Sequence, residues 1–176
     1  MHPWIEAQKP AAGTRVVVGL SGGVDSAVTA LRLREMGCEV FGVTTKNFCS
    51  SELPSQVEPD ESSCCGDEAI AAARELCADL GIPHRVIDLA PSFVPEVIQD
   101  FGAEYLAGRT PNPCVRCNRL VRWPGLLRFA EAMEATHLAT GHYARRVEHP
   151  ATGSHVARAE DPAKDQSYYL HGLSSG

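Results

Sequence analysis

The chain has 176 residues, of which 44% are hydrophobic and 22% are charged, and its formal net charge is −6. This composition is typical of a globular protein long enough to bury a core, and it excludes disordered and fibrous proteins. No apolar run approaches about 18 residues, and no basic segment leads into an apolar one at the start. We therefore expect no membrane span. The odd number of cysteines without a secretory signal argues against an oxidised secreted protein, so we expect a cytoplasmic one.

The acidic balance is uneven along the chain. Between Glu52 and Glu104 there are twelve acidic residues against two arginines, whereas between Arg109 and Arg146 there are seven arginines against two glutamates. The second range could attract a polyanion even though the whole chain is acidic. An uneven but merely solvated surface is the alternative interpretation.

The first predicted elements are a buried strand at residues 15–20, a helix at residues 24–36 that ends before Gly37, and a second strand at residues 39–44. The strands are predicted from short β-branched runs, and the helix from its apolar spacing and the glycine beyond its end. A polar stretch rich in Ser, Pro, Glu and Cys follows at residues 46–65. A loop of that length in a compact domain is more often functional than neutral.

A strong helix is predicted at residues 67–80, followed by a strand at 85–89 and a helix at 91–106. Residues 109–118 are expected to be irregular, because Pro111 and Pro113 disfavour helix around them. A helix at 124–135, a strand at 137–140, a hairpin with strands at 144–147 and 155–159, and a helix opening at 165–173 complete the order. The alternation predicts an α/β fold, a doubly wound, mainly parallel sheet with helices on both faces. Ligands of such sheets bind beyond the carboxyl ends of the strands.

The segment SGGVDS at residues 21–26 lies between the first strand and the first helix. Gly22 and Gly23 permit a tight turn, and the free N–H groups of a helix start suit phosphate. Asp25 would repel a bare phosphate, so its presence favours a magnesium-bridged pyrophosphate. The segment is neither a Walker A loop nor GxGxxG. A glycine turn capped by aspartate is the alternative.

The seven cysteines fall into three groups. Cys38 and Cys77 have apolar neighbours and are predicted to be packed, whereas Cys49, Cys64 and Cys65 lie in the polar loop. Cys114 and Cys117 form a CxxC beside Arg116 and Arg119, and positive charge favours a reactive thiolate. A zinc half-site or a structural turn is the alternative, although the chain has no second CxxC.

Four further motifs follow SGGVDS: GVTTKNF at 42–48, AGRTPNPCVRCNR at 107–119, ATGHYARR at 139–146 and KDQSYYL at 164–170. With these motifs the chain resembles the bacterial tRNA-specific 2-thiouridylases, which are PP-loop ATP pyrophosphatases with an adenine nucleotide alpha hydrolase-like fold. The resemblance covers residues 15 to about 173. It implies ATP-dependent 2-thiolation of the wobble uridine of tRNA. The uracil C2 oxygen is adenylated with release of pyrophosphate, and enzyme-bound sulfur then attacks C2.

The resemblance also implies roles for individual residues. Cys117 is the implied nucleophile. The implied ATP contacts are Gly19, Leu20, Ser21, Gly22, Gly23, Val24, Asp25, Ser26, Thr45 and Gly141. The implied contacts to the target base are Asn112, Pro113 and Cys114, and those to tRNA are Lys164, Asp165 and Gln166. ATP and Mg²⁺ are the implied cofactors, and tRNA and a sulfur-donor protein or persulfide carrier are the implied partners. No metal ligand is assigned, although an iron–sulfur cluster at Cys114 and Cys117 is a variant.

The chain departs from the family pattern at three points. Thr45 stands where methionine is common, and Cys114 stands where some members have aspartate. The family also has a second catalytic cysteine and further RNA-binding domains after the KDQ segment. We expect residues 1–14 to be an extension, and residues 15–176 to be a catalytic domain truncated before those domains. Alternatively, Cys114 replaces the second cysteine and forms a disulfide with Cys117.

Two other functions stay open at the level of sequence. One is a PP-loop synthetase that adenylates a small molecule, and the other is a nucleotide- or RNA-binding domain without turnover. The CxxC among arginines favours the thiolating enzyme over both.

Overall fold

The computed structural model describes residues 5–6, 9–47 and 67–173, and its chain forms two compact units. One unit is Ala11–Gly141. The other combines Met1–Pro10 with His142–Gly176. The polar loop cysteines Cys49, Cys64 and Cys65 lie outside the described residues.

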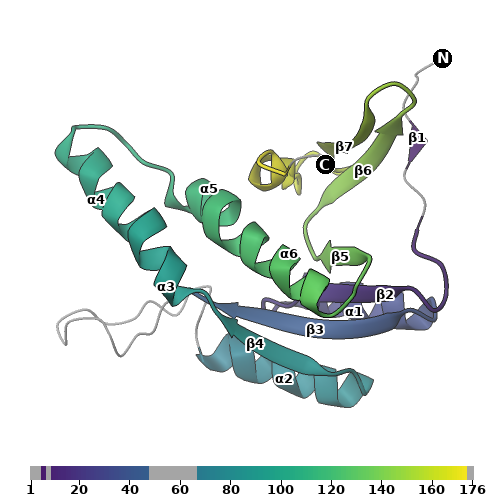
Figure 1. The fold of residues 1–176 in the computed structure, drawn as a ribbon. Helices are drawn as coiled ribbons and strands as arrows, with labels where there is room; N and C mark the ends of the chain where they lie inside the picture. The colour runs from purple at the N-terminus through teal and green to yellow at the C-terminus, as the bar shows by residue number, and fades with distance from the viewer. Residues whose placement is uncertain (1–4, 7–8, 48–66, 174–176) are drawn as a thin grey trace. The chain divides into compact units, whose positions relative to one another are not determined.

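A four-stranded parallel sheet organises the larger unit (Figure 1). Its strands are β2 (Arg15–Gly19), β3 (Glu39–Lys46), β4 (His84–Asp88) and β5 (His137–Thr140), in the order β4-β3-β2-β5. In β2 the side chains of Val16, Val17 and Val18 are fully buried, as expected for a central strand covered on both faces. Gly19 pairs with Val43 of β3 and with Thr140 of β5, so the ends of the central strands lie in register.

Helices cover both faces of this sheet, which confirms the predicted doubly wound α/β class (Figure 1). On one face, α1 (Val24–Glu35) and α2 (Asp67–Leu80) pack Leu33 and Cys77 against Val16, Val18 and Val40. On the other face, α6 (Trp123–Ala132) buries Leu126 and Ala130. The predicted packing of Cys38 and Cys77 is confirmed, since their side chains are 8% and 1% exposed.

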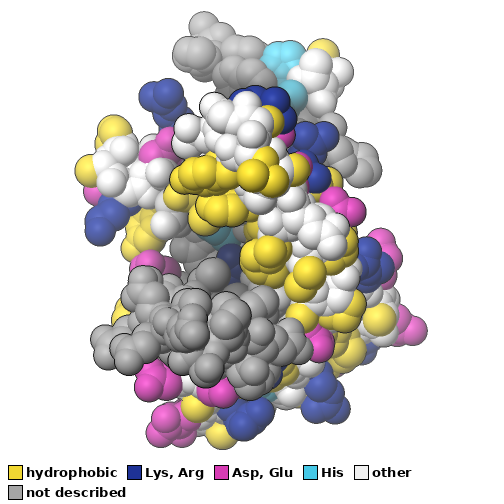
Figure 2. All heavy atoms as spheres, turned by 90° about the vertical axis from the view of Figure 1, so that its left-hand side faces the viewer, with side chains coloured by type: hydrophobic (Ala, Val, Ile, Leu, Met, Phe, Trp, Pro, Cys, Tyr) yellow, Lys and Arg dark blue, Asp and Glu magenta, His cyan; other side chains and the backbone are white. Residues whose placement is uncertain are grey.

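Two helical runs contain π-helical turns. The first run is α3 (Ala90–Phe93), η2 (Val94–Ile98) and α4 (Gln99–Leu106). Pro95 lies in its π turn, where a missing N–H group disrupts α-helical bonding. The run exposes several apolar side chains, and Figure 2 shows hydrophobic atoms on the side of the molecule that carries α3 and α4.

The second run corrects the expectation of an irregular segment at residues 109–118. It begins with α5 (Pro113–Cys117), continues through the π turn η3 (Asn118–Arg122) and joins α6. Pro113 is tolerated because it occupies the first turn, where its missing N–H group has no intrahelical partner to lose. Asn112 caps the helix, since its side-chain oxygen accepts a hydrogen bond from the Val115 N–H group at 3.2 Å.

The smaller unit is an antiparallel sheet in the order β1-β6-β7. Its strands are β1 (Ile5–Glu6), β6 (Ala144–His149) and β7 (Gly153–Arg158), and β6 and β7 confirm the predicted hairpin. The helix expected at residues 165–173 is only one short 3-10 turn, η4 (Ser167–Leu170). Among the described helices, none has the length and apolar content needed to cross a membrane.

Candidate functional site

The loop between β2 and α1 is held by its own serines. Ser26 is buried and donates its hydroxyl to the Gly23 carbonyl at 2.9 Å, while the Ser21 N–H group donates to Ser26 Oγ at 3.2 Å. Gly23 is the N-cap of α1, and no side chain among the described residues caps the helix start. A glycine-rich loop that leads into a helix start without a side-chain cap is the arrangement that phosphate sites use.

Two glycines bring neighbouring elements against this loop. Gly22 has φ +79°, and a β-carbon there would stand 2.8 Å from the Ala69 backbone in the first turn of α2. A β-carbon at Gly141, just after β5, would stand 2.6 Å from the Ser26 nitrogen. Only glycine allows such contacts. The structure thus brings predicted residues 19–26 and Gly141 together at the carboxyl edge of the sheet.

The end of β3 lies at the same edge of the sheet. Thr45 is buried in β3, two residues beyond the Val43 that pairs with Gly19. Asn47 follows the strand and donates its side-chain N–H group to the Cys117 sulfur at 3.9 Å. Through this contact Cys117 lies at the same edge of the sheet as the glycine loop, although Cys117 and the loop are far apart in sequence.

The two cysteines of α5 differ in exposure. Cys114, in the first turn, is exposed, whereas Cys117, at the end of the helix, is half-buried and packs against the cluster of Leu89, Val97 and Val121. Neither forms a disulfide with another described cysteine. Asn112 and Pro113 form the start of the same helix, so the predicted base-contact residues and the predicted nucleophile belong to one short helix and its cap.

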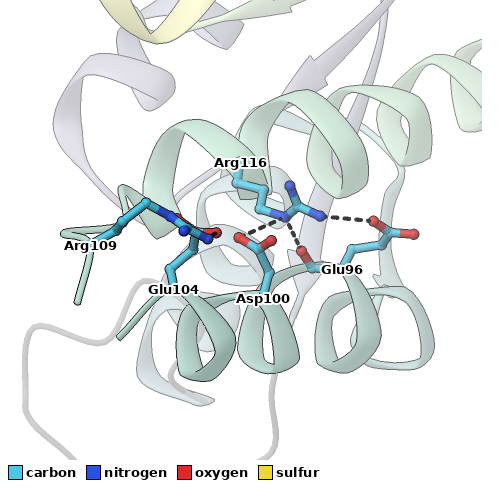
Figure 3. Close-up of polar contacts among 5 residues, drawn as sticks. All are labelled: Glu96, Asp100, Glu104, Arg109 and Arg116. Atoms are coloured by element: carbon cyan, nitrogen blue, oxygen red, sulfur yellow. Dashed lines mark hydrogen bonds and ion pairs between the residues drawn. The ribbon is translucent and has the colours of Figure 1, made fainter. Parts of the chain in front are cut away.

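Ion pairs join α5 to the preceding helical run (Figure 3). Arg116 pairs with Asp100 at 3.2 Å and with Glu96 at 3.7 Å, and Arg109 pairs with Glu104. The Arg109 guanidinium, through its hydrogen bond, lowers the pKa of the Glu104 carboxyl. We expected Arg116 and Arg119 to act as positive charges beside Cys117. For Arg116 this effect is reduced, because the carboxylates of Asp100 and Glu96 compensate its charge.

The donor atoms at the site fit magnesium better than a cluster. Asp25 is a single carboxylate at the loop, which suits a magnesium ion carried mainly by substrate phosphates. Cys114 and Cys117 supply two thiols, and within residues 9–47 and 67–173 no group of three metal-binding side chains is present. The described residues therefore do not fit an iron–sulfur cluster, for which three or four protein ligands are usual.

The predicted tRNA-contact triplet lies in the smaller unit. Asp165 accepts hydrogen bonds from the N–H groups of Ala159 and Ser167 and from the Ser167 hydroxyl. These bonds, led by that from Ala159, lower the pKa of Asp165. Gln166 bonds to both backbone groups of Tyr143. Asp165 and Gln166 thus hold this segment in shape, while Lys164 is exposed.

Sequence reasoning missed two features of the site. One is Asn47, although a polar residue directly after a buried strand is a usable signal for a ligand-facing position. The other is the acidic stripe of Glu96, Asp100 and Glu104. Its spacing of four residues places the three carboxylates on one helix face, which indicates a partner for nearby arginines.

The chain is similar to known tRNA-modifying proteins. It is 44% identical over 160 residues to the tRNA-specific 2-thiouridylase MnmA of Amoebophilus asiaticus, covering 91% of this chain and 42% of that protein. It is 47% identical over 159 residues to MnmA 1 of Syntrophus aciditrophicus, covering 90% and 41%. The chain thus spans about two fifths of the length of these curated relatives.

A solved structure, a predicted tRNA methyltransferase subunit from Methanocaldococcus jannaschii, matches 73% of this chain and 52% of its own with a TM-score of 0.48 at 23% identity. The family model described as tRNA methyl transferase HUP domain matches residues 14–176. Because that match spans nearly the whole chain, the protein belongs to the tRNA methyl transferase HUP domain family.

Proposed function

We propose that the protein is a tRNA-uridine 2-sulfurtransferase that thiolates the wobble uridine of tRNA with ATP. One observation carries the proposal: the glycine loop before α1 and the thiol of Cys117 lie at the same edge of one parallel sheet. Thiolation needs an activating nucleotide and a sulfur nucleophile side by side. The 44% identity to a curated 2-thiouridylase supports this reaction over other uses of the edge.

The glycine loop would bind ATP through backbone N–H groups at the start of α1. Asp25 would hold a magnesium ion, which supplies charge neutralisation for the phosphates. The uracil O2 attacks the α-phosphorus, so an O–P bond forms there while the bond to pyrophosphate breaks. The C2 oxygen then belongs to an AMP leaving group, which is far better than the carbonyl oxygen that it replaces.

Cys117 would deliver the sulfur as a persulfide received from a donor. Its terminal sulfur attacks C2 and AMP departs, which leaves the base joined to Cys117 through a disulfide. A second thiolate attacks the Cys117 sulfur, breaks the S–S bond and releases 2-thiouridine. Cys114, exposed one turn away, is one source of that thiolate, and a partner protein is another.

The test incubates the purified protein with ATP, magnesium, a persulfide donor and tRNA, followed by mass spectrometry of digested nucleosides. We expect 2-thiouridine and tRNA-dependent release of pyrophosphate. Asp25→Asn should lose both products, whereas Cys117→Ser should retain pyrophosphate release without 2-thiouridine. Absence of 2-thiouridine with all components present contradicts the proposal. Pyrophosphate exchange that depends on a small molecule and not on tRNA would favour the synthetase instead.

A further inference from the structure

Asn47 contacts Cys117 from across the fold. It follows the last residue of β3, and its side-chain N–H group donates to Cys117 Sγ at 3.9 Å. The contact joins residues 70 positions apart. Catalytic hydrogen bonds are often long before substrate binds and shorten in the reacting complex. The contact therefore brings a fixed donor to the sulfur that the proposed reaction uses.

The other end of the Asn47 amide has an unusual environment. Asn47 is 3% exposed, yet its Oδ1 atom accepts no hydrogen bond from the described residues. Buried polar atoms that serve structure alone are almost always paired. Thr44, three residues earlier in β3, shows the ordinary case, because its buried hydroxyl bonds to His84 at 2.9 Å. Among the described residues, the hydrogen bond of the buried Asn47 amide therefore goes to a thiol.

We propose that Asn47 is a positioning residue for Cys117, holding the sulfur at the edge of the sheet and stabilising its thiolate. A donated hydrogen bond favours the charged form of an acceptor over the neutral form. The effect of Asn47 on catalysis rests on the proposed function, whereas the effect of its hydrogen bond on the ionisation of the Cys117 thiol does not. Arg116 and Arg119 are the cations predicted to favour the thiolate, and the charge of Arg116 is compensated by Glu96 and Asp100.

Other charged groups occur on the elements that pack around Cys117. Glu96 and Asp100 pair with Arg116, and the Asp88 carboxylate accepts a hydrogen bond from the Ala90 N–H group at 2.9 Å. The further cations on β3, α5 and η3 are Lys46, Arg119 and Arg122. These cations act on the sulfur through space and are unchanged by substitution of Asn47. A comparison of Asn47 variants therefore isolates the hydrogen bond.

The first experiment measures the rate of iodoacetamide alkylation at Cys117 against pH, with the peptide identified by mass spectrometry. In Asn47→Ala, the pH midpoint at Cys117 should rise by about half a unit to one unit, the effect of one lost hydrogen bond. Asn47→Asp should raise it further, because a carboxylate repels the thiolate. The midpoint at the exposed Cys114 should stay unchanged in both variants.

Thr44→Val is the matched control, since it removes a buried hydrogen bond from β3, three residues before Asn47, and that bond does not involve Cys117. It should lower the melting temperature and leave the Cys117 midpoint unchanged. The proposal is overturned if the Asn47 variants fold and their Cys117 midpoint equals that of the wild type. It is also overturned if Thr44→Val moves the midpoint as far as Asn47→Ala does.

A second measurement needs no Asn47 variant and so does not depend on its folding. In the wild-type protein, the NMR resonances of the Asn47 side-chain NH₂ group should shift with pH, with the same midpoint as Cys117 alkylation. Cys117→Ser should abolish that shift. Resonances that stay flat across the alkylation midpoint contradict the proposal. If the wild-type protein shows this pH-dependent shift of the Asn47 resonances but does not thiolate tRNA, the result would count against the proposed function alone.

Discussion

A β-carbon at Gly141 would stand 2.6 Å from the backbone nitrogen of Ser26, closer than a β-carbon in a real protein approaches another heavy atom. The end of β5 and the start of α1 are therefore in direct backbone contact. This contact fixes the distance between the glycine loop and the neighbouring strand. A ligand at the start of α1 would therefore lie beside the end of β5, which cannot move without disturbing the sheet.

Gly141→Ala should impair both folding and nucleotide binding. The new methyl group clashes with backbone, which cannot rotate away as a side chain can, so we expect a loss of about 1–3 kcal/mol in the free energy of unfolding. ATP affinity, measured by isothermal titration calorimetry, should fall about tenfold or more as the loop shifts. Gly102→Ala is the matched control, because nothing lies within 4 Å of its position. A melting temperature and ATP affinity unchanged by Gly141→Ala would contradict this interpretation.

The stability of the protein should fall in mild acid because of His84. Burial, with added repulsion from Arg74 and Arg85, holds the pKa of His84 below its usual value near 6.5. The folded protein therefore binds fewer protons at this site than the unfolded chain does. Its stabilising effect is fully present above the unfolded pKa and is lost as pH falls through the folded pKa.

We expect the melting temperature to fall between about pH 7.5 and about pH 5, and to fall less in His84→Gln. Thr44→Val separates the hydrogen bond from the titration, since it removes the partner hydroxyl and leaves the imidazole in place. Its melting temperature should be lower at every pH, with the slope of the wild type. Equal slopes for wild type and His84→Gln would show that His84 is not the group responsible.

Loss of the Arg116 pairs should loosen the cysteine helix more than the whole fold. The guanidinium and its two carboxylate partners are partly exposed, so each pair contributes less than about 1 kcal/mol to global stability. In Arg116→Met, however, α5 loses ties to both η2 and α4. Hydrogen exchange should therefore rise at the backbone N–H groups of α5 that follow Pro113, while the melting temperature changes little. Arg119→Met, on the exposed side of the next turn, should leave exchange there unchanged.

The cysteines should differ sharply in reactivity towards iodoacetamide. Cys77 is 1% exposed, and burial raises the pKa of its thiol, so its alkylation waits for opening of the fold. Cys114 is exposed in the first turn of α5 and should react more than about tenfold faster at neutral pH. Peptide mass spectrometry measures both rates in one sample. In urea the two alkylation rates should become equal. A difference between the rates that persists in urea would show that burial is not its cause.

Periodicity was sufficient to predict the sheet and the main helices. The helix predicted at residues 67–80 coincides with α2, because acidic residues in its first turn and Gly81 beyond its end mark both limits. Strand ends were less well predicted, and β3 continues two residues past the expected Thr44, because hydrogen bonding to β4 extends it. Such pairing depends on a neighbouring strand rather than on local sequence.

The site was harder to predict where it depends on packing. Pro113 disfavours helix in a helix interior but is well suited to the first turn, and the cap by Asn112 decides between these outcomes. The contact from Asn47 to Cys117 and the pairs of Arg116 join segments that only the folded chain brings together. The sequence contained the residue types for the site, but their partners could not be read from spacing alone.

The π turn at Asn118–Arg122 makes the cysteine helix sensitive to chain length. A π turn contains one residue more than an α turn, so deletion of one residue there would restore regular α-helix. Because α6 is anchored by its buried residues, the adjustment would rotate α5 by about 100° about the helix axis. Cys117 would then leave Asn47, and Arg116 would leave its carboxylates. An insertion or a deletion in this segment would therefore rotate α5 about its axis and change the direction in which the Cys117 thiol points relative to the sheet.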